Sequence, residues 1–249
     1  MIERSGLPLV EEFDRIVIFG GANGIGLAFS QLVDALGIPG VIADVDPSGG
    51  ERIAALKHAT FVPCDATREE DVRRALKSSM APNRCGVVST VGGAHATDFL
   101  KVDLSAWEAE VRFNLTSAYL ICAVSLGLMK EGGMGGSIVL TSSSYGFKPA
   151  PTRVGYSAAK AGIVAMTRSL AILGAEFGVR VNCVAPGPTN TVRIAADGQS
   201  LSTQSLALTT PLGRLSEPAD VASAIAYALF SARTMTGQVI HINSGKFIP

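Results

Sequence analysis

Tyr156 and Lys160 stand four residues apart in the stretch VGYSAAKAGI, residues 154–163. On a helix, this spacing places two side chains on one face. A fixed ammonium group stabilises a phenolate, so a hydroxyl with an ordinary pKa of about 10 can exchange its proton at lower pH. The chain contains 21 Lys and Arg residues, so the same spacing also arises by accident. The pair is therefore a candidate proton-transfer group that needs support from the rest of the sequence.

A glycine-rich turn lies near the N-terminus, in VIFGGANGIGLAF (17–29), with Gly20, Gly24 and Gly26 between an apolar run and a helical pattern. Glycines let the backbone turn tightly and approach a pyrophosphate, which then lies at the positive end of the helix. The spacing is G-x-x-x-G-x-G, whereas other dinucleotide-binding proteins have G-x-G-x-x-G. A simple tight turn is the alternative, but the position between a strand and a helix favours a dinucleotide site.

Asp44 ends the second predicted strand, 18 residues beyond Gly26. A carboxylate at this place can accept hydrogen bonds from the ribose hydroxyls of adenosine, and it would repel a 2′-phosphate. Neither position 23 nor position 45 carries an Arg or Lys that could pair with that phosphate. The sequence therefore predicts NAD(H) as cofactor in preference to NADP(H); the alternative is an acid that merely ends an exposed strand.

Short apolar runs alternate with longer helical patterns, which is typical of a parallel sheet covered by helices. The predicted strands occupy residues 15–20, 41–44, 59–64, 87–91, 137–142, 179–185 and 238–242. The predicted helices occupy residues 25–36, a stretch that ends at Met80, and residues 105–130, 155–177 and 217–230. The helix ending at Met80 begins with a capping-box pattern, Thr67 to Glu70.

These patterns predict a single α/β domain over residues 1–249, doubly wound, with a seven-stranded parallel sheet and helices on both faces. The least regular stretch, about residues 188–212, is expected to be a substrate loop, because long loops in such domains usually bind ligands.

Composition excludes several classes of protein. Apolar residues make up 47% of the chain, charged residues 17%, and the formal net charge is zero, so neither disorder nor a nucleic-acid partner is expected. The longest apolar run (118–129) is too short to span a bilayer, and charges interrupt the N-terminal residues, so we expect no membrane segment, no secretory signal and a cytoplasmic location. The cysteines are scattered without metal-ligand spacing, and we expect no metal and reduced thiols at Cys64, Cys85, Cys122 and Cys183.

Three motifs, GGANGIG, YSAAK and NCVAPGPTNT, resemble those of the short-chain dehydrogenase/reductase family in its compact single-domain branch, and the resemblance runs from about residue 14 to residue 245. It implies a Rossmann-type fold and a catalytic set of Asn, Ser, Tyr and Lys. Asn114, Tyr156 and Lys160 match three members of that set. Ser143, in the run TSSS, lies 13 residues before Tyr156 and matches the fourth; its neighbours Ser142 and Ser144 remain alternatives.

The resemblance also implies the residues that hold the dinucleotide. Thr191 is expected to bond the nicotinamide carboxamide, and Asp65 to contact adenine, although an N-cap role suits Asp65 equally well. The full expected set is Gly20, Asn23, Gly24, Ile25, Gly26, Asp44, Asp65, Gly92, Tyr156, Lys160, Pro186, Gly187, Thr189 and Thr191.

The chain departs from the family's pattern at three places. Phe19 replaces a threonine before the first motif glycine, Ser89-Thr90-Val91-Gly92 replaces Asn-Asn-Ala-Gly, and Asn243-Ser244-Gly245 replaces Asp-Gly-Gly. The bonds that brace the fourth strand in relatives must therefore be made otherwise or are lost. None of the changes removes a group that does the chemistry.

The prediction is an NAD(H)-dependent oxidoreductase that interconverts a secondary alcohol and a ketone of a small molecule, with NADP less favoured. A 3-oxoacyl-thioester reductase using NADPH and a non-catalytic dinucleotide-binding module are the alternatives. The resemblance further implies a homodimer or homotetramer formed through the helices at 105–130 and 155–177. Arg153 either meets an anionic substrate group or is a surface arginine, and His95 either lines the substrate cleft or faces solvent.

Overall fold

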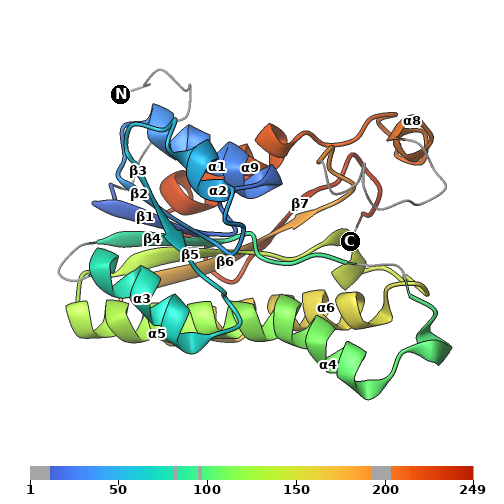
Figure 1. Ribbon diagram of the computed structural model, residues 1–249, viewed down its shortest axis with the longest axis horizontal. Coiled ribbons are helices and arrows are strands. Elements are labelled where there is room, and N and C mark those ends of the chain that lie inside the picture. The colour runs from blue at the N-terminus through green and yellow to red at the C-terminus, as the bar shows by residue number, and fades with distance from the viewer. Residues whose placement is uncertain (1–11, 81–83, 95–96, 192–202, 249) are drawn as a thin grey trace.

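A seven-stranded parallel sheet forms the centre of the protein (Figure 1). The computed structural model describes residues 12–80, 84–94, 97–191 and 203–248. The strands are β1 (Arg15–Phe19), β2 (Gly40–Asp44), β3 (Ala59–Pro63), β4 (Cys85–Ser89), β5 (Gly136–Thr141), β6 (Val179–Pro186) and β7 (Val239–Ile242). They lie in the order β3-β2-β1-β4-β5-β6-β7, and each neighbouring pair is parallel.

The order of strands reverses between β1 and β4, and this reversal positions the functional site. In open α/β sheets, ligands bind beyond the carboxyl ends of the strands at such a switch point. The strands there are buried on both faces, which is why they read as continuous apolar runs in the sequence. The predicted doubly wound α/β fold is confirmed.

Helices cover both faces of the sheet (Figure 1). One face carries α1 (Gly24–Ala35) and α9 (Pro218–Ala226); the other carries α3 (Glu69–Met80), α4 (Leu104–Val111), α5 (Ser117–Gly132) and α6 (Val154–Ala175). Successive residues of β1 point to opposite faces, so Ile18 joins the core under α1 and α9 while Phe19 joins the core under α3, α5 and α6.

Two predicted helices differ in detail from the structure. The stretch expected as one α-helix at 105–130 is interrupted by a π-helical turn at Arg112–Thr116, and the helix expected to reach residue 230 finishes in a π-helical turn at Tyr227–Ser231. Two short helices, α2 (Gly49–Ile53) and α8 (Thr203–Ala207), lie where no helix was predicted.

The predicted capping box at Thr67 is wrong. The Thr67 hydroxyl donates to Asp65 Oδ1 (2.7 Å), as does the Thr67 backbone N–H (2.9 Å), and α3 begins only at Glu69. An aspartate readily bonds the backbone two residues on, and here that local turn takes the place of the cap.

The helical stretches Leu104–Gly132 and Val154–Ala175 are long and apolar enough to cross a membrane by length and hydropathy. Both stretches pack against the sheet, and residues such as Ile121 and Ile163 belong to its core. Core packing thus accounts for much of their apolar character.

Candidate active site

A cavity of about 660 Å³ opens beyond the carboxyl ends of the strands. Its volume lies within the range of small-molecule and cofactor sites. All the expected dinucleotide-binding residues line it: Gly20, Asn23, Gly24, Ile25, Gly26, Asp44, Asp65, Gly92, Tyr156, Lys160, Pro186, Gly187, Thr189 and Thr191. Ser143 lines the same cavity. Residues 192–202 of the expected substrate loop, and His95, lie outside the described residues.

Lys160 and Tyr156 share one face of α6, as their spacing predicts. Lys160 Nζ lies 5.6 Å from the centre of the Tyr156 ring. The same nitrogen donates to the backbone oxygens of Thr141 (3.0 Å) and Val91 (3.4 Å), and the residue is only 2% exposed. A buried cation requires such partners. They fix a positive charge beside the ring of Tyr156.

The neighbouring serines at the end of β5 have different partners. Ser142 Oγ donates to the backbone oxygen of Lys160 (2.7 Å), so its proton is engaged in holding α6 against the sheet. Ser143 Oγ accepts a bond from the Tyr145 N–H (3.2 Å), which leaves the Ser143 proton available for a ligand in the cavity. The geometry favours Ser143 over Ser142 as the group that bonds a substrate oxygen.

Asn114 lies in the π-helical turn, behind the cavity wall rather than on it. Its Oδ1 accepts from the Gly93 N–H (3.0 Å), and its Nδ2 donates to the Gly93 oxygen (3.0 Å) and the Glu110 oxygen (3.1 Å). A Cβ at Gly92 would lie 2.6 Å from both Asn114 Oδ1 and Lys160 Nζ, and the φ of Gly92 is +136°, so only glycine suits this place. Asn114 thus holds the loop that carries a carbonyl partner of Lys160; its expected water-relay role stays a prediction. A π-turn of this kind often marks a functional site.

The glycine-rich turn fits an anionic ligand. Gly20 has φ +74° and Gly24 φ +50°, and a Cβ at Gly26 would lie 2.0 Å from the Gly20 oxygen, so the start of α1 rests directly on the turn. Asn23 precedes α1 without a side-chain capping bond, and its amide nitrogen donates to Asp46. The first N–H groups of α1 are therefore left for a ligand such as a pyrophosphate.

The departure after β4 supplies a brace of its own, through Thr90. Thr90 Oγ1 donates to the backbone oxygens of Phe19 (3.1 Å) and Gly20 (3.0 Å), so it braces the end of β4 against the turn. Phe19 itself is fully buried in the core. Near the C-terminus, Asn243 accepts from the Gly245 N–H (2.9 Å) and donates to the Phe247 oxygen (2.8 Å), which organises that turn through the side chain of Asn243.

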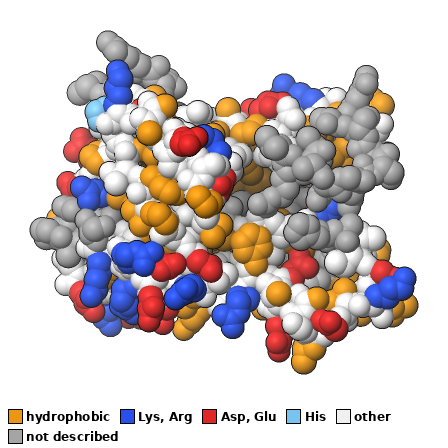
Figure 2. Space-filling model, in the orientation of Figure 1, with side chains coloured by type: hydrophobic (Ala, Val, Ile, Leu, Met, Phe, Trp, Pro, Cys, Tyr) orange, Lys and Arg blue, Asp and Glu red, His pale blue; other side chains and the backbone are white. Residues whose placement is uncertain are grey.

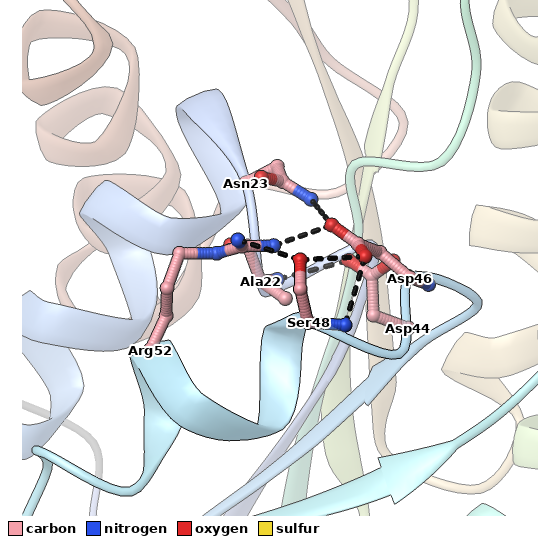
Figure 3. A network of polar contacts seen from close by, with 6 residues as sticks. All are labelled: Ala22, Asn23, Asp44, Asp46, Ser48 and Arg52. Carbon is pink, nitrogen blue, oxygen red and sulfur yellow. Dashed lines mark hydrogen bonds and ion pairs between the residues drawn. The ribbon is translucent and has the colours of Figure 1, made fainter.

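A polar network ties the glycine-rich turn to the loop after β2 (Figure 3). Both backbone groups of Ala22 are bonded: its N–H donates to Asp44 Oδ2 (3.0 Å), and its oxygen accepts from Arg52 Nε (2.9 Å). Arg52 also pairs with Asp46, which in turn accepts from the amide of Asn23. Hydrogen bonds from Asn23, Ser48 and Arg52 hold the pKa of Asp46 well below its usual range.

Sequence reasoning missed the side chains of this network other than Asn23 and Asp44, and Arg52 is the most important of them because it joins the turn to Asp46. It lies eight residues beyond Asp44 and carries no motif signal. Its guanidinium is committed to Asp46, Ser48 and the Ala22 carbonyl. Asp44 meanwhile remains on the cavity wall, with Oδ1 accepting from the Asp46 N–H (3.0 Å).

Similar proteins are found both by sequence and by structure. The family model described as enoyl-(acyl carrier protein) reductase matches residues 20–246. L-fucose dehydrogenase of Oryctolagus cuniculus is 29% identical, over 92% of this chain and 84% of its own length. Cis-4-hydroxycyclohexanecarboxylate dehydrogenase of Sinomonas cyclohexanicum is 33% identical, over 92% and 94%. The crystal structure of gox2181 superposes with a TM-score of 0.85 at 26% identity, covering 95% of this chain and 96% of the other.

Proposed function

The chain belongs to the short-chain dehydrogenase/reductase family, and from that membership we propose that it is an NAD(H)-dependent enzyme that interconverts a secondary alcohol and a ketone of a small molecule. The observation that carries the proposal is the buried Lys160 ammonium, 5.6 Å from the Tyr156 ring, in the cavity that also exposes Asp44 and the uncapped start of α1. Proton transfer and dinucleotide binding then share one cavity.

Oxidation of an alcohol removes a hydride from carbon and a proton from oxygen. A bound nicotinamide exchanges the hydride. The Tyr156 hydroxyl takes the proton in oxidation and returns it in reduction, and the fixed charge of Lys160 stabilises the phenolate between these events. Ser143 bonds the substrate oxygen as its charge develops. Asn114 maintains the loop that positions Lys160, and we propose that it also orders a water for proton relay.

The choice of NAD over NADP rests on Asp44. This carboxylate lies at the end of β2 on the cavity wall, where it would bond ribose hydroxyls and repel a 2′-phosphate. The nearby cation Arg52 is paired with Asp46 and so is already engaged. We expect NADH to bind at least about tenfold more tightly than NADPH, as measured by fluorescence titration. Asp44→Ala should reduce this difference in affinity between the two cofactors.

Asp65→Asn is the matched control for Asp44→Ala, because Asp65 is the other carboxylate among the described residues on the cavity wall. It should change the affinities for the two cofactors alike and leave their ratio intact. A wild-type preference for NADPH would refute the cofactor assignment.

Two other functions are separated from this one by simple measurements. A 3-oxoacyl-thioester reductase would oxidise NADPH with acetoacetyl-thioesters and turn over secondary alcohols poorly. A non-catalytic dinucleotide-binding module would bind the cofactor without turnover of any alcohol or ketone. The names of the two curated relatives are those of dehydrogenases that act on hydroxyl-bearing compounds, and this supports an alcohol substrate.

We propose that the protein is cytoplasmic and acts without nucleic acid or membrane partners. On the face shown in Figure 2, basic and acidic side chains are interspersed. Helix α3 contains the ion pairs Arg73–Glu69 and Arg74–Asp71.

We further propose a homodimer or homotetramer formed through α5 and α6. Less than half of the most apolar window of each helical stretch is buried, and Tyr119 and Ile172 are exposed. Sedimentation equilibrium should give twice or four times the chain mass; a monomer would contradict this.

A further inference from the structure

Arg153 is a charged residue of the cavity wall that the proposed chemistry leaves unused. It directly precedes α6 and lies three residues before Tyr156. Among the described residues, Lys160 is the other cation on the wall, and its ammonium is buried against two backbone carbonyls. Arg153 is only partly buried, and it lines the cavity close to the proton-transfer group.

The charges on the cavity wall are divided between its two ends. The acidic wall residues of the described chain, Asp44 and Asp65, follow β2 and β3. Arg153 belongs to the other end, beyond β5, and β1 and β4 lie between the two groups in the sheet. The end that holds Tyr156 therefore has positive wall residues, with no acidic one among those described.

Tyr145 connects Arg153 to the reacting phenol. The Arg153 guanidinium carbon lies 5.6 Å from the centre of the Tyr145 ring, and this ring meets Tyr156 edge-on at 6.4 Å. Lys148 Nζ lies 5.1 Å from the centre of the same Tyr145 ring. Contacts of cations with an aromatic face are attractive, and they hold both charges near the site. Burial and the charge of Lys246 lower the pKa of Lys148, as expected where positive groups gather.

We propose that the substrate carries a carboxylate as well as the reacting hydroxyl or carbonyl, and that Arg153 binds this carboxylate while Tyr156 acts on the oxygen. The proposal rests on the function proposed above, because it uses the same cavity and the same proton-transfer group. A guanidinium offers two parallel N–H donors that match one carboxylate. A phosphate would require donors beyond this single arginine.

Benzoate and benzamide, which have nearly the same shape but differ in charge, test this with the NADH-loaded protein. We expect benzoate to bind at least about tenfold more tightly than benzamide, measured by the change in NADH fluorescence. Arg153→Gln should abolish the difference, and Arg153→Met provides a second variant should the first not fold. Lys148→Met is the matched control: it removes the other cation on the Tyr145 ring, which is not a wall residue, and should keep most of the preference for benzoate.

The outcomes separate the inference from the proposed function. Equal affinities for benzoate and benzamide, or a preference that survives in both Arg153 variants, would overturn the inference while the proposed function stands. Failure of the wild-type protein to bind NADH would overturn both. Each variant is titrated with NADH first, which shows whether it has folded.

Discussion

Tyr156→Phe is expected to lower kcat by roughly 100-fold or more, the usual scale for removing a general acid or base. The substitution deletes only the hydroxyl, so the ring keeps its edge contact with Tyr145 and its place 5.6 Å from Lys160 Nζ. NADH affinity should therefore change little. Initial rates with a secondary alcohol, together with NADH titration, measure the two effects separately.

Tyr145→Phe is the matched control. Tyr145 lines the same cavity and loses the same single atom, but the proposed chemistry gives its hydroxyl no proton to transfer, so we expect kcat to fall less than about tenfold. Near wild-type turnover in Tyr156→Phe, or equal losses in the two variants, would remove Tyr156 from the mechanism.

Gly26→Ala is expected to abolish tight cofactor binding. The added Cβ would lie 2.0 Å from the Gly20 oxygen and 2.6 Å from Thr90 Oγ1, so α1 must move away from the turn on which it rests. Overpacking of this kind costs about 1–3 kcal/mol of stability, and the displaced N–H groups no longer converge on the ligand. We expect at least a tenfold loss of NADH affinity, or about 1.4 kcal/mol, by fluorescence titration.

Gly132→Ala serves as the control for Gly26→Ala. A Cβ at Gly132, at the end of α5, would meet nothing within 4 Å, so the variant should keep both its melting temperature and its NADH affinity. If Gly26→Ala bound NADH as well as Gly132→Ala, the turn would not be the phosphate site.

The fold could be predicted because its central strands are buried on both faces and read as uninterrupted apolar runs. The strand at 15–20, for example, is found at Arg15–Phe19. The π-helical turn at Arg112–Thr116 could not be predicted, because the local sequence RFNLT contains neither glycine nor proline and the apolar pattern shifts by only one residue. Helix α2 was missed because Pro47, Gly49 and Gly50 indicate a turn.

The sequence predicted those residues of the candidate site whose spacing is fixed within one helix or one turn. The four-residue step from Tyr156 to Lys160 and the glycines of the turn are of this kind. The bonds from Arg52 to Ala22 and from Thr90 to Gly20 join elements distant in the sequence, so they depend on which strands become neighbours. Asn114 was predicted as a site residue, but its position behind Gly92 depends on the π-turn, which was not predicted.

The π-turn joins α4 and α5 so that their side chains can face in different directions about the helix axis. Each residue advances an α-helix by about 100°, so the extra residue in Arg112–Thr116 rotates α5 out of phase with α4. Asn114 can then face the Gly93 backbone while Ile121 and Cys122 press against the sheet. A chain shortened by one residue at this turn would lose either the hydrogen bonds between Asn114 and Gly93 or the packing of Ile121 and Cys122 in the core.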